Sequence, residues 1–133
     1  MRLNTLLYGF KPKRKRFTFA NPYCKGVFVL SITIFAVGKL KESFWKEACA
    51  EYLKRLGAYC KITVKEFPDS NKEREAELLL SHLPEHAPIL LLDIKGKEIS
   101  SETLATKIDT YALSGSSQLV FIIGGSDGVI SEV

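Results

Sequence analysis

Three glycines follow the most apolar stretch of the chain, and they mark the first place where this sequence could form a ligand site. The run from Gln118 to Ile123 is apolar and β-branched, which is typical of a strand buried on both faces. It ends in Gly124 and Gly125, and Gly128 follows shortly after. Because glycine lacks a Cβ and accepts backbone angles closed to other residues, a ligand or a second backbone can approach the main chain closely here.

A plain turn between a strand and a helix is the competing interpretation of these glycines, since an isolated GGxxG pattern is weak evidence for a site. Position favours the site, because ligands of open parallel sheets bind outside the carboxyl ends of the strands. If the ligand were a phosphate, the loop should present backbone N–H groups with no opposing charge. Asp127 lies inside the loop and argues mildly against a phosphate.

Lysines follow two other predicted strands and should lie at the same edge of the sheet as the glycine loop. A rim of lysines suits a polyanion, because lysine contacts phosphate without needing a fixed geometry. Ordinary solvated loop lysines are the alternative. The four residues of this predicted rim are Lys39, Lys41, Lys95 and Lys97.

The elements that must position these residues are four strands that alternate with three helices. We expect strands over residues 32–37, 61–67, 89–94 and 118–123. Ser43, Ser70 (with Glu73 in a capping box) and Ser100 or Ser101 are the expected helix N-caps. This alternation predicts an α/β fold, a parallel sheet with flanking helices joined by right-handed crossovers.

Each predicted helix carries an apolar stripe at helical spacing, which we interpret as a face directed into the core. Gly57 and Pro84 are the expected stops of the first two helices. The stripes are Phe44, Trp45, Ala48, Cys49, Tyr52, Leu53 and Leu56; then Ala76, Leu79, Leu80 and Leu83; then Leu104, Ala105, Ile108, Tyr111 and Ala112.

Charge divides the chain into two parts. Residues 1–29 hold seven of the 19 lysines and arginines and no acid, whereas residues 30–133 hold 12 basic and 15 acidic residues. We therefore expect 1–29 to be a basic, disordered extension outside the fold, whose deletion leaves stability nearly unchanged. Residues 27–37 could pass for the apolar region of a signal peptide, but their β-branched content favours a buried strand.

The cysteines and histidines indicate no metal site. Cys24, Cys49 and Cys60 share no metal-ligand spacing, and their odd number argues against a disulfide framework, so we expect reduced thiols in a cytoplasmic protein. His82 and His86 flank a proline at a predicted helix end, where solvation or capping is the expected role.

Three stretches in the same order resemble the ribosomal RNA large subunit methyltransferase H family of the SPOUT, or α/β-knot, methyltransferases. They are AVGKLKESFWKEACAEYLKRLGAYCKI (36–62), LLLDIKGKEISSETLA (90–105) and FIIGGSDG (121–128), within residues 30–133. The resemblance implies methylation of N3 of a pseudouridine in large-subunit ribosomal RNA, with S-adenosylmethionine as methyl donor. It also implies a cytoplasmic homodimer that works on the ribosome and not at a membrane.

The resemblance carries over two cofactor-binding positions, Leu92 and Gly124, and no catalytic residue. It also implies that the family's domain continues past the glycine loop into the part that forms the knot. We therefore expect this chain to be a fragment that binds S-adenosylmethionine weakly, with an apolar face and a sheet edge left uncovered. A non-catalytic RNA-binding or dimerisation remnant and another nucleotide-binding α/β domain are the alternative functions.

Overall fold

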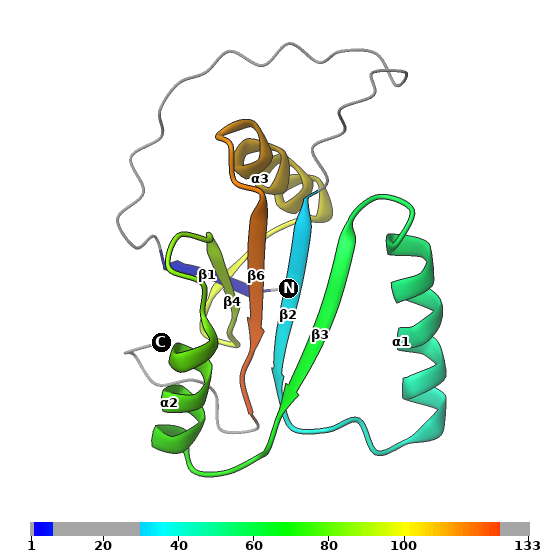
Figure 1. Ribbon diagram of the computed structural model, residues 1–133, viewed down its shortest axis with the longest axis vertical. Coiled ribbons are helices and arrows are strands. Elements are labelled where there is room, and N and C mark those ends of the chain that lie inside the picture. Colours follow the sequence, from blue (N-terminus) through cyan, green and yellow to red (C-terminus); the bar gives the residue numbers. More distant parts are fainter. Residues whose placement is uncertain (1, 7–29, 126–133) are drawn as a thin grey trace.

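The computed structural model describes residues 2–6 and 30–125 of the chain (Figure 1). Its elements alternate between strands and helices over most of this length. In chain order they are β1 (Arg2–Leu6), β2 (Ser31–Val37), α1 (Ser43–Leu56), β3 (Lys61–Phe67), α2 (Lys72–His82), β4 (Ile89–Leu92), β5 (Lys97–Glu98), α3 (Ser101–Leu113) and β6 (Gln118–Ile123).

The centre of the fold is a six-stranded sheet with the order β3-β2-β6-β4-β1-β5. Strand β2 pairs in parallel with β3 and β6, and β4 pairs in parallel with β6. These are the four strands that the sequence predicted, so the expected α/β fold with a parallel sheet is confirmed.

Residues 31–37 form an interior strand of this sheet, which supports the strand interpretation over the signal peptide. No helix in the described part of the chain is long and apolar enough to cross a membrane.

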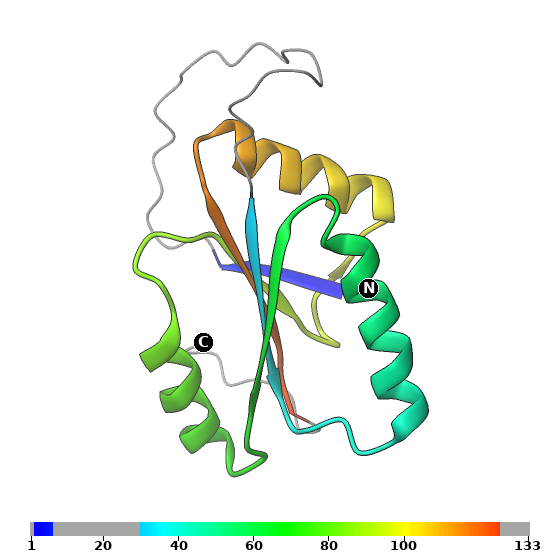
Figure 2. The same cartoon turned by 45° about the vertical axis from the view of Figure 1, so that its right-hand side comes forward.

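Strand β1 was not expected. It pairs antiparallel with β4, with Leu3 opposite Leu92 and Leu6 opposite Ile89, and it also pairs with β5 (blue in Figures 1 and 2). The prediction that residues 1–29 lie outside the fold is therefore wrong for residues 2–6, because their backbone completes the free edge of β4. Residues 7–29 lie outside the described residues, as does any knot-forming segment.

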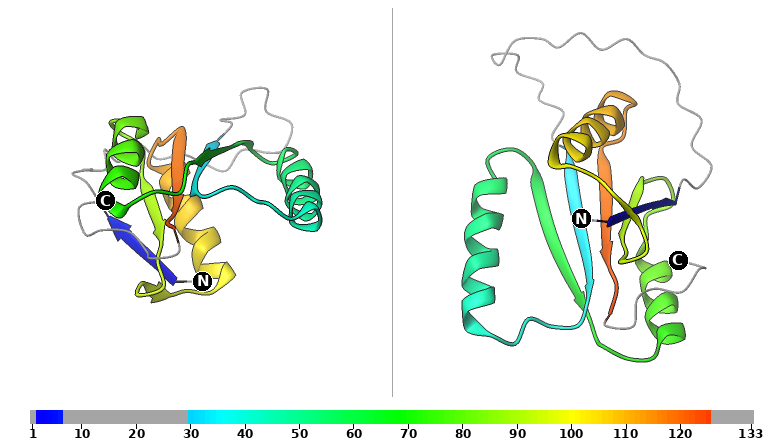
Figure 3. Two further views of the ribbon diagram at one scale, coloured as in Figure 1. Left: turned by 90° about the horizontal axis from the view of Figure 1, so that it is seen from below. Right: turned by 180° about the vertical axis from the view of Figure 1, so that it is seen from behind.

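Helices α2 and α3 cover opposite faces of the sheet (Figure 3). On the α2 face, buried side chains of the sheet such as Phe35, Val120 and Ile122 pack against Ala76 and Leu79 of the helix. On the α3 face, Leu90 and Leu119 are fully buried, and Leu104, Ile108 and Tyr111 of α3 pack against them. The predicted inward positions of α2 hold except for Leu80, which is 47% exposed.

Helix α1 corrects the prediction that its aromatic stripe belongs to the core. None of its residues is buried, and Phe44, Trp45 and Tyr52 are each more than half exposed. The helix stands away from the sheet beside β3, joined to it by two connecting segments (Figure 3). An amphipathic pattern shows which side of a helix is apolar, but burial needs a partner surface, and the described residues supply little of it here.

Each predicted helix N-cap lies within one residue of the observed N-cap. Ser100 caps α3 by accepting a hydrogen bond from the Thr103 N–H at 3.2 Å, as expected. The cap of α2 is Asn71, which accepts from the Arg74 N–H at 2.9 Å, so the predicted Ser70–Glu73 capping box is wrong. For α1 the N-cap is Glu42 and not Ser43, and no side chain caps it.

Candidate ligand site at the glycine loop

The two predicted cofactor residues lie at the ends of neighbouring strands. Leu92, the last residue of β4, pairs with Ile123, the last residue of β6, and Gly124 follows directly. On the other side of β6, Ile123 pairs with Ala36 near the end of β2. The glycine loop therefore begins between two parallel strands, at the carboxyl edge where α/β sheets bind ligands. Asp127 and Gly128 lie outside the described residues.

Gly125 lies against a side chain of α2. A Cβ added to Gly125 would be 3.2 Å from Oε2 of Glu75, 3.5 Å from its Oε1 and 3.4 Å from Cγ1 of Val37. Gly125 does not adopt a positive φ, so the absence of a side chain, and not an unusual backbone angle, is what this position requires. The groups close to Gly125 are side chains of the protein itself, whereas the sequence predicted a ligand or a second backbone there.

Sequence reasoning missed Glu75. Its side chain is buried, at 7% exposure, and its Oε1 accepts a hydrogen bond from the Ser70 N–H at 2.8 Å. The signal was present in the helical period, since Glu75 lies four residues before Leu79 and next to Ala76 on the buried face of α2.

The loop after β2 carries two of the rim lysines and is anchored to the end of β3. The Gly38 N–H donates to the Phe67 carbonyl at 2.9 Å, and the Leu40 N–H donates to Oε1 of Glu66 at 3.4 Å. Gly38 has φ +90°, a conformation that L side chains rarely adopt, so glycine is required for this turn. The exposed side chains of Lys39 and Lys41 are therefore carried on a defined turn.

The loop after β4 brings a third lysine to the carboxyl edge. Asp93 closes a tight turn, with its Oδ1 accepting from the Lys95 N–H at 3.2 Å and its carbonyl accepting from the Gly96 N–H at 3.0 Å. Since β6 lies between β2 and β4, the loops that carry Lys39, Lys41 and Lys95 follow the two strands on either side of the glycine loop. Lys97 lies in β5, an edge strand two places from β4, and it is level with Leu92 because Leu3 of β1 pairs with both residues.

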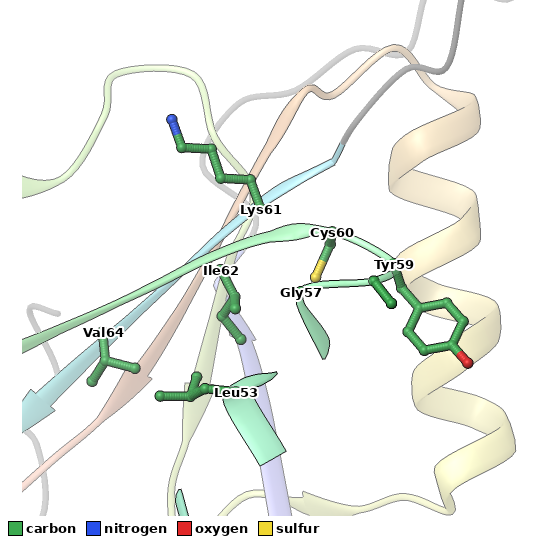
Figure 4. A pocket seen from close by; sticks show the side chains of 8 residues that line it. Leu53, Gly57, Tyr59, Cys60, Lys61, Ile62 and Val64 are labelled. Carbon is green, nitrogen blue, oxygen red and sulfur yellow. The ribbon is translucent and has the colours of Figure 1, made fainter. Parts of the chain in front are cut away.

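Two cavities lie at the opposite edge of the sheet from the glycine loop. The larger, of about 590 Å³, lies where α1 leads into β3, and Figure 4 shows Leu53 of α1 and Ile62 of β3 directed toward the same space. The smaller, of about 400 Å³, lies before β4 and β6 and is lined partly by His86 and Ser116. Neither cavity includes Leu92 or Gly124.

The histidines and described cysteines take structural positions. His82 bonds through Nδ1 to the Leu78 carbonyl at 2.8 Å and packs edge-on against the Phe67 ring, which confirms a role at the helix end. Cys49 and Cys60 are thiols, and burial raises the pKa of the Cys60 thiol. Within residues 2–6 and 30–125, no cluster of three or more potential ligands could hold a metal ion.

These features define an α/β protein with a glycine loop at the carboxyl edge of its parallel strands. A family model described as predicted SPOUT methyltransferase matches residues 30–133, which is most of the chain. The chain therefore belongs to the SPOUT methyltransferase family. Membership implies a methyltransferase, and enzymes of this class generally take the methyl group from S-adenosylmethionine.

The residues at the carboxyl edge fit such a cofactor. Leu92 is half-buried, and Ile123 is 40% exposed, so the two strand ends present apolar surface suited to an adenine ring. Gly124 comes next in the chain and carries no side chain to block a ligand from the backbone.

Proposed function

We propose that this chain supplies the cofactor site of a methyltransferase that acts on N3 of a pseudouridine in large-subunit ribosomal RNA. The observation that carries the proposal is the pairing of Leu92 with Ile123, which brings Leu92 and Gly124 to adjacent strand ends. The family match supports the methyl transfer, and the resemblance of the three sequence stretches supports the RNA substrate.

In this proposal the cofactor supplies an activated methyl group on a sulfonium. Leu92 and Ile123 contribute the apolar wall, and the backbone at Gly124 allows close approach. Methylation of N3 also requires loss of the N3 proton; no base among the described residues is assigned to it, so the proposal has this proton leave to solvent. Catalysis then depends on holding the methyl group and the nucleophilic nitrogen in line, an effect of orientation that can supply much of the rate.

The RNA would be held by the lysines beside the glycine loop. Residues 30–133 carry a small net negative charge, so local placement and not overall charge must attract the RNA. Lys39, Lys41 and Lys95 are exposed in loops that follow the strands flanking β6. Lysine contacts of this kind position a phosphate backbone without reading its sequence.

Residue-resolved NMR titration of the chain with S-adenosylmethionine tests the cofactor site, because it detects weak binding. We expect amide shifts at Leu92, Gly124 and Gly125, and none with ATP at equal concentration. Gly124→Val should remove these shifts by placing a branched side chain where the cofactor approaches. Ser117→Val, at the other end of β6, is the matched control and should keep them.

Two results would overturn parts of the proposal. Equal shifts with ATP would favour the nucleotide-binding alternative, and shifts that persist in Gly124→Val would show that the glycine loop is only a turn. The RNA substrate is tested separately, by incubating a large-subunit RNA fragment with and without the target pseudouridine and measuring binding and methyl transfer. Binding that does not depend on the pseudouridine, with no transfer, would favour the non-catalytic remnant.

A further inference from the structure

Glu75 is a buried acid that the proposed chemistry does not use. Burying a carboxylate is costly unless other groups satisfy its charge. Within the described residues, the ion pairs are Arg55–Glu51 and His86–Glu85, and neither includes Glu75. The position is nevertheless favourable in two ways: Glu75 lies in the first turn of α2, where the helix dipole stabilises negative charge, and it accepts the Ser70 N–H.

The carboxylate lies between two loops that come from different parts of the chain. Oε1 receives the hydrogen bond of Ser70, in the connection from β3 to α2. Oε2 faces Gly125, in the loop after β6, at a distance that leaves little room for a side chain there. One side chain therefore bonds to one loop and faces the other at the carboxyl edge of the sheet, at the residue that follows Gly124 in the chain.

We propose that Glu75 is a positioning residue that fixes Gly124 and Gly125, the first residues of the glycine loop, against the β3–α2 connection. The Ser70 hydrogen bond holds the carboxylate in place, and the carboxylate then limits where the backbone at Gly124 and Gly125 lies. A ligand that binds by approaching this backbone meets a preformed surface, which reduces the ordering cost of binding. The consequence for S-adenosylmethionine rests on the proposed function; the fixing of the loop does not.

Backbone order parameters from ¹⁵N relaxation test the inference without any ligand. In the full chain, Gly124 and Gly125 should have values near the rigid limit of about 0.85, and Glu75→Ala should lower them below about 0.6. Glu75→Gln keeps an oxygen that accepts the Ser70 N–H, so it should restore values close to those of the parent. Glu77→Ala, an exposed acid on the same helix, is the control and should change nothing.

A second pair of variants covers the case in which Glu75→Ala does not fold. Ser70→Pro removes the N–H donor and leaves Glu75 in place, whereas Ser70→Ala keeps the donor. Only the proline variant should loosen Gly124 and Gly125. It should also lower the apparent affinity for S-adenosylmethionine, measured from the amide shifts, at least tenfold. The amide of Ile122, a buried strand residue, should keep its protection from hydrogen exchange.

Unchanged order parameters at Gly124 and Gly125 in both Glu75→Ala and Ser70→Pro would overturn the inference. Loosening in Glu75→Gln equal to that in Glu75→Ala would also overturn it, because the retained acceptor should suffice. If the parent chain shows no shifts with S-adenosylmethionine, the proposed cofactor site fails, and the order parameters still decide the role of Glu75.

Discussion

A side chain added to Gly125 would crowd the buried carboxylate of Glu75. The added Cβ would be 3.2 Å from Oε2 of Glu75 and 3.4 Å from Cγ1 of Val37. Glu75 cannot easily move, because it is buried and bonded to the backbone of Ser70. The loop after β6 and the start of α2 are thus fitted to each other.

Gly125→Ala should lower the free energy of unfolding by about 1–3 kcal/mol, the usual cost of overpacking. Urea unfolding followed by circular dichroism measures the change. Gly57→Ala is the control, since Gly57 has ordinary helical angles and its added Cβ would meet carbonyl oxygens at 3.4–3.5 Å. That variant should be neutral or slightly stabilising. Equal stability of the two variants would contradict the tight contact at Gly125.

Thr5→Pro should destabilise the chain, contrary to the expectation from sequence that residues 1–29 are dispensable. Thr5 pairs with Leu90 in the antiparallel ladder between β1 and β4, and proline there disturbs backbone pairing. We expect a loss of about 1–3 kcal/mol, since each hydrogen bond contributes about 1 kcal/mol. Thermal unfolding measures this loss of stability, with Thr5→Val as the matched control variant. A variant as stable as the parent would show that β1 adds nothing to the fold.

Self-association should depend on the exposed apolar side chains of α1. Trp45 is 55% and Tyr52 65% exposed, and the helix buries none of its residues. Exposed apolar surface of this kind promotes association, and the resemblance implies a homodimer. In sedimentation velocity, the double variant Trp45→Lys, Tyr52→Lys should shift the chain toward monomer. The variant Ala50→Lys is the control on the same helix, and a monodisperse parent at high concentration would contradict the prediction.

Alkylation of Cys60 should require a higher pH than alkylation of an ordinary thiol. Burial raises the pKa of the Cys60 thiol, so less of the reactive thiolate is present at a given pH. The same shift stabilises the fold below the ordinary thiol pKa, and this contribution is lost as pH rises through the folded value. The rate of Cys60 alkylation is measured by mass spectrometry over a pH series, once in the folded chain and once in urea. Equal rates would contradict the raised pKa.

The sequence by itself determined the four parallel strands, the three helices and the position of the glycine loop after β6. These features follow from local patterns, because continuous apolar runs predict buried strands and helical spacing predicts helices. The sequence also placed Leu92 and Gly124 at one edge of the sheet, since parallel strands bring their carboxyl ends together there. That β4 and β6 are neighbours was decided by the tertiary structure. The residue types at Ser100 and Pro84 likewise fixed the helix ends through local hydrogen bonds and excluded backbone angles.

Only the tertiary structure decided which surfaces meet. Strand β1 joins β4 through backbone pairing, and the sequence of residues 2–6 does not predict this pairing. The stripe of α1 looked like core, yet burial depends on a partner surface distant in sequence. Glu75 has no special local pattern either. Its position matters because α2 packs on the sheet so that the carboxylate lies beside Gly125, 50 residues later in the chain.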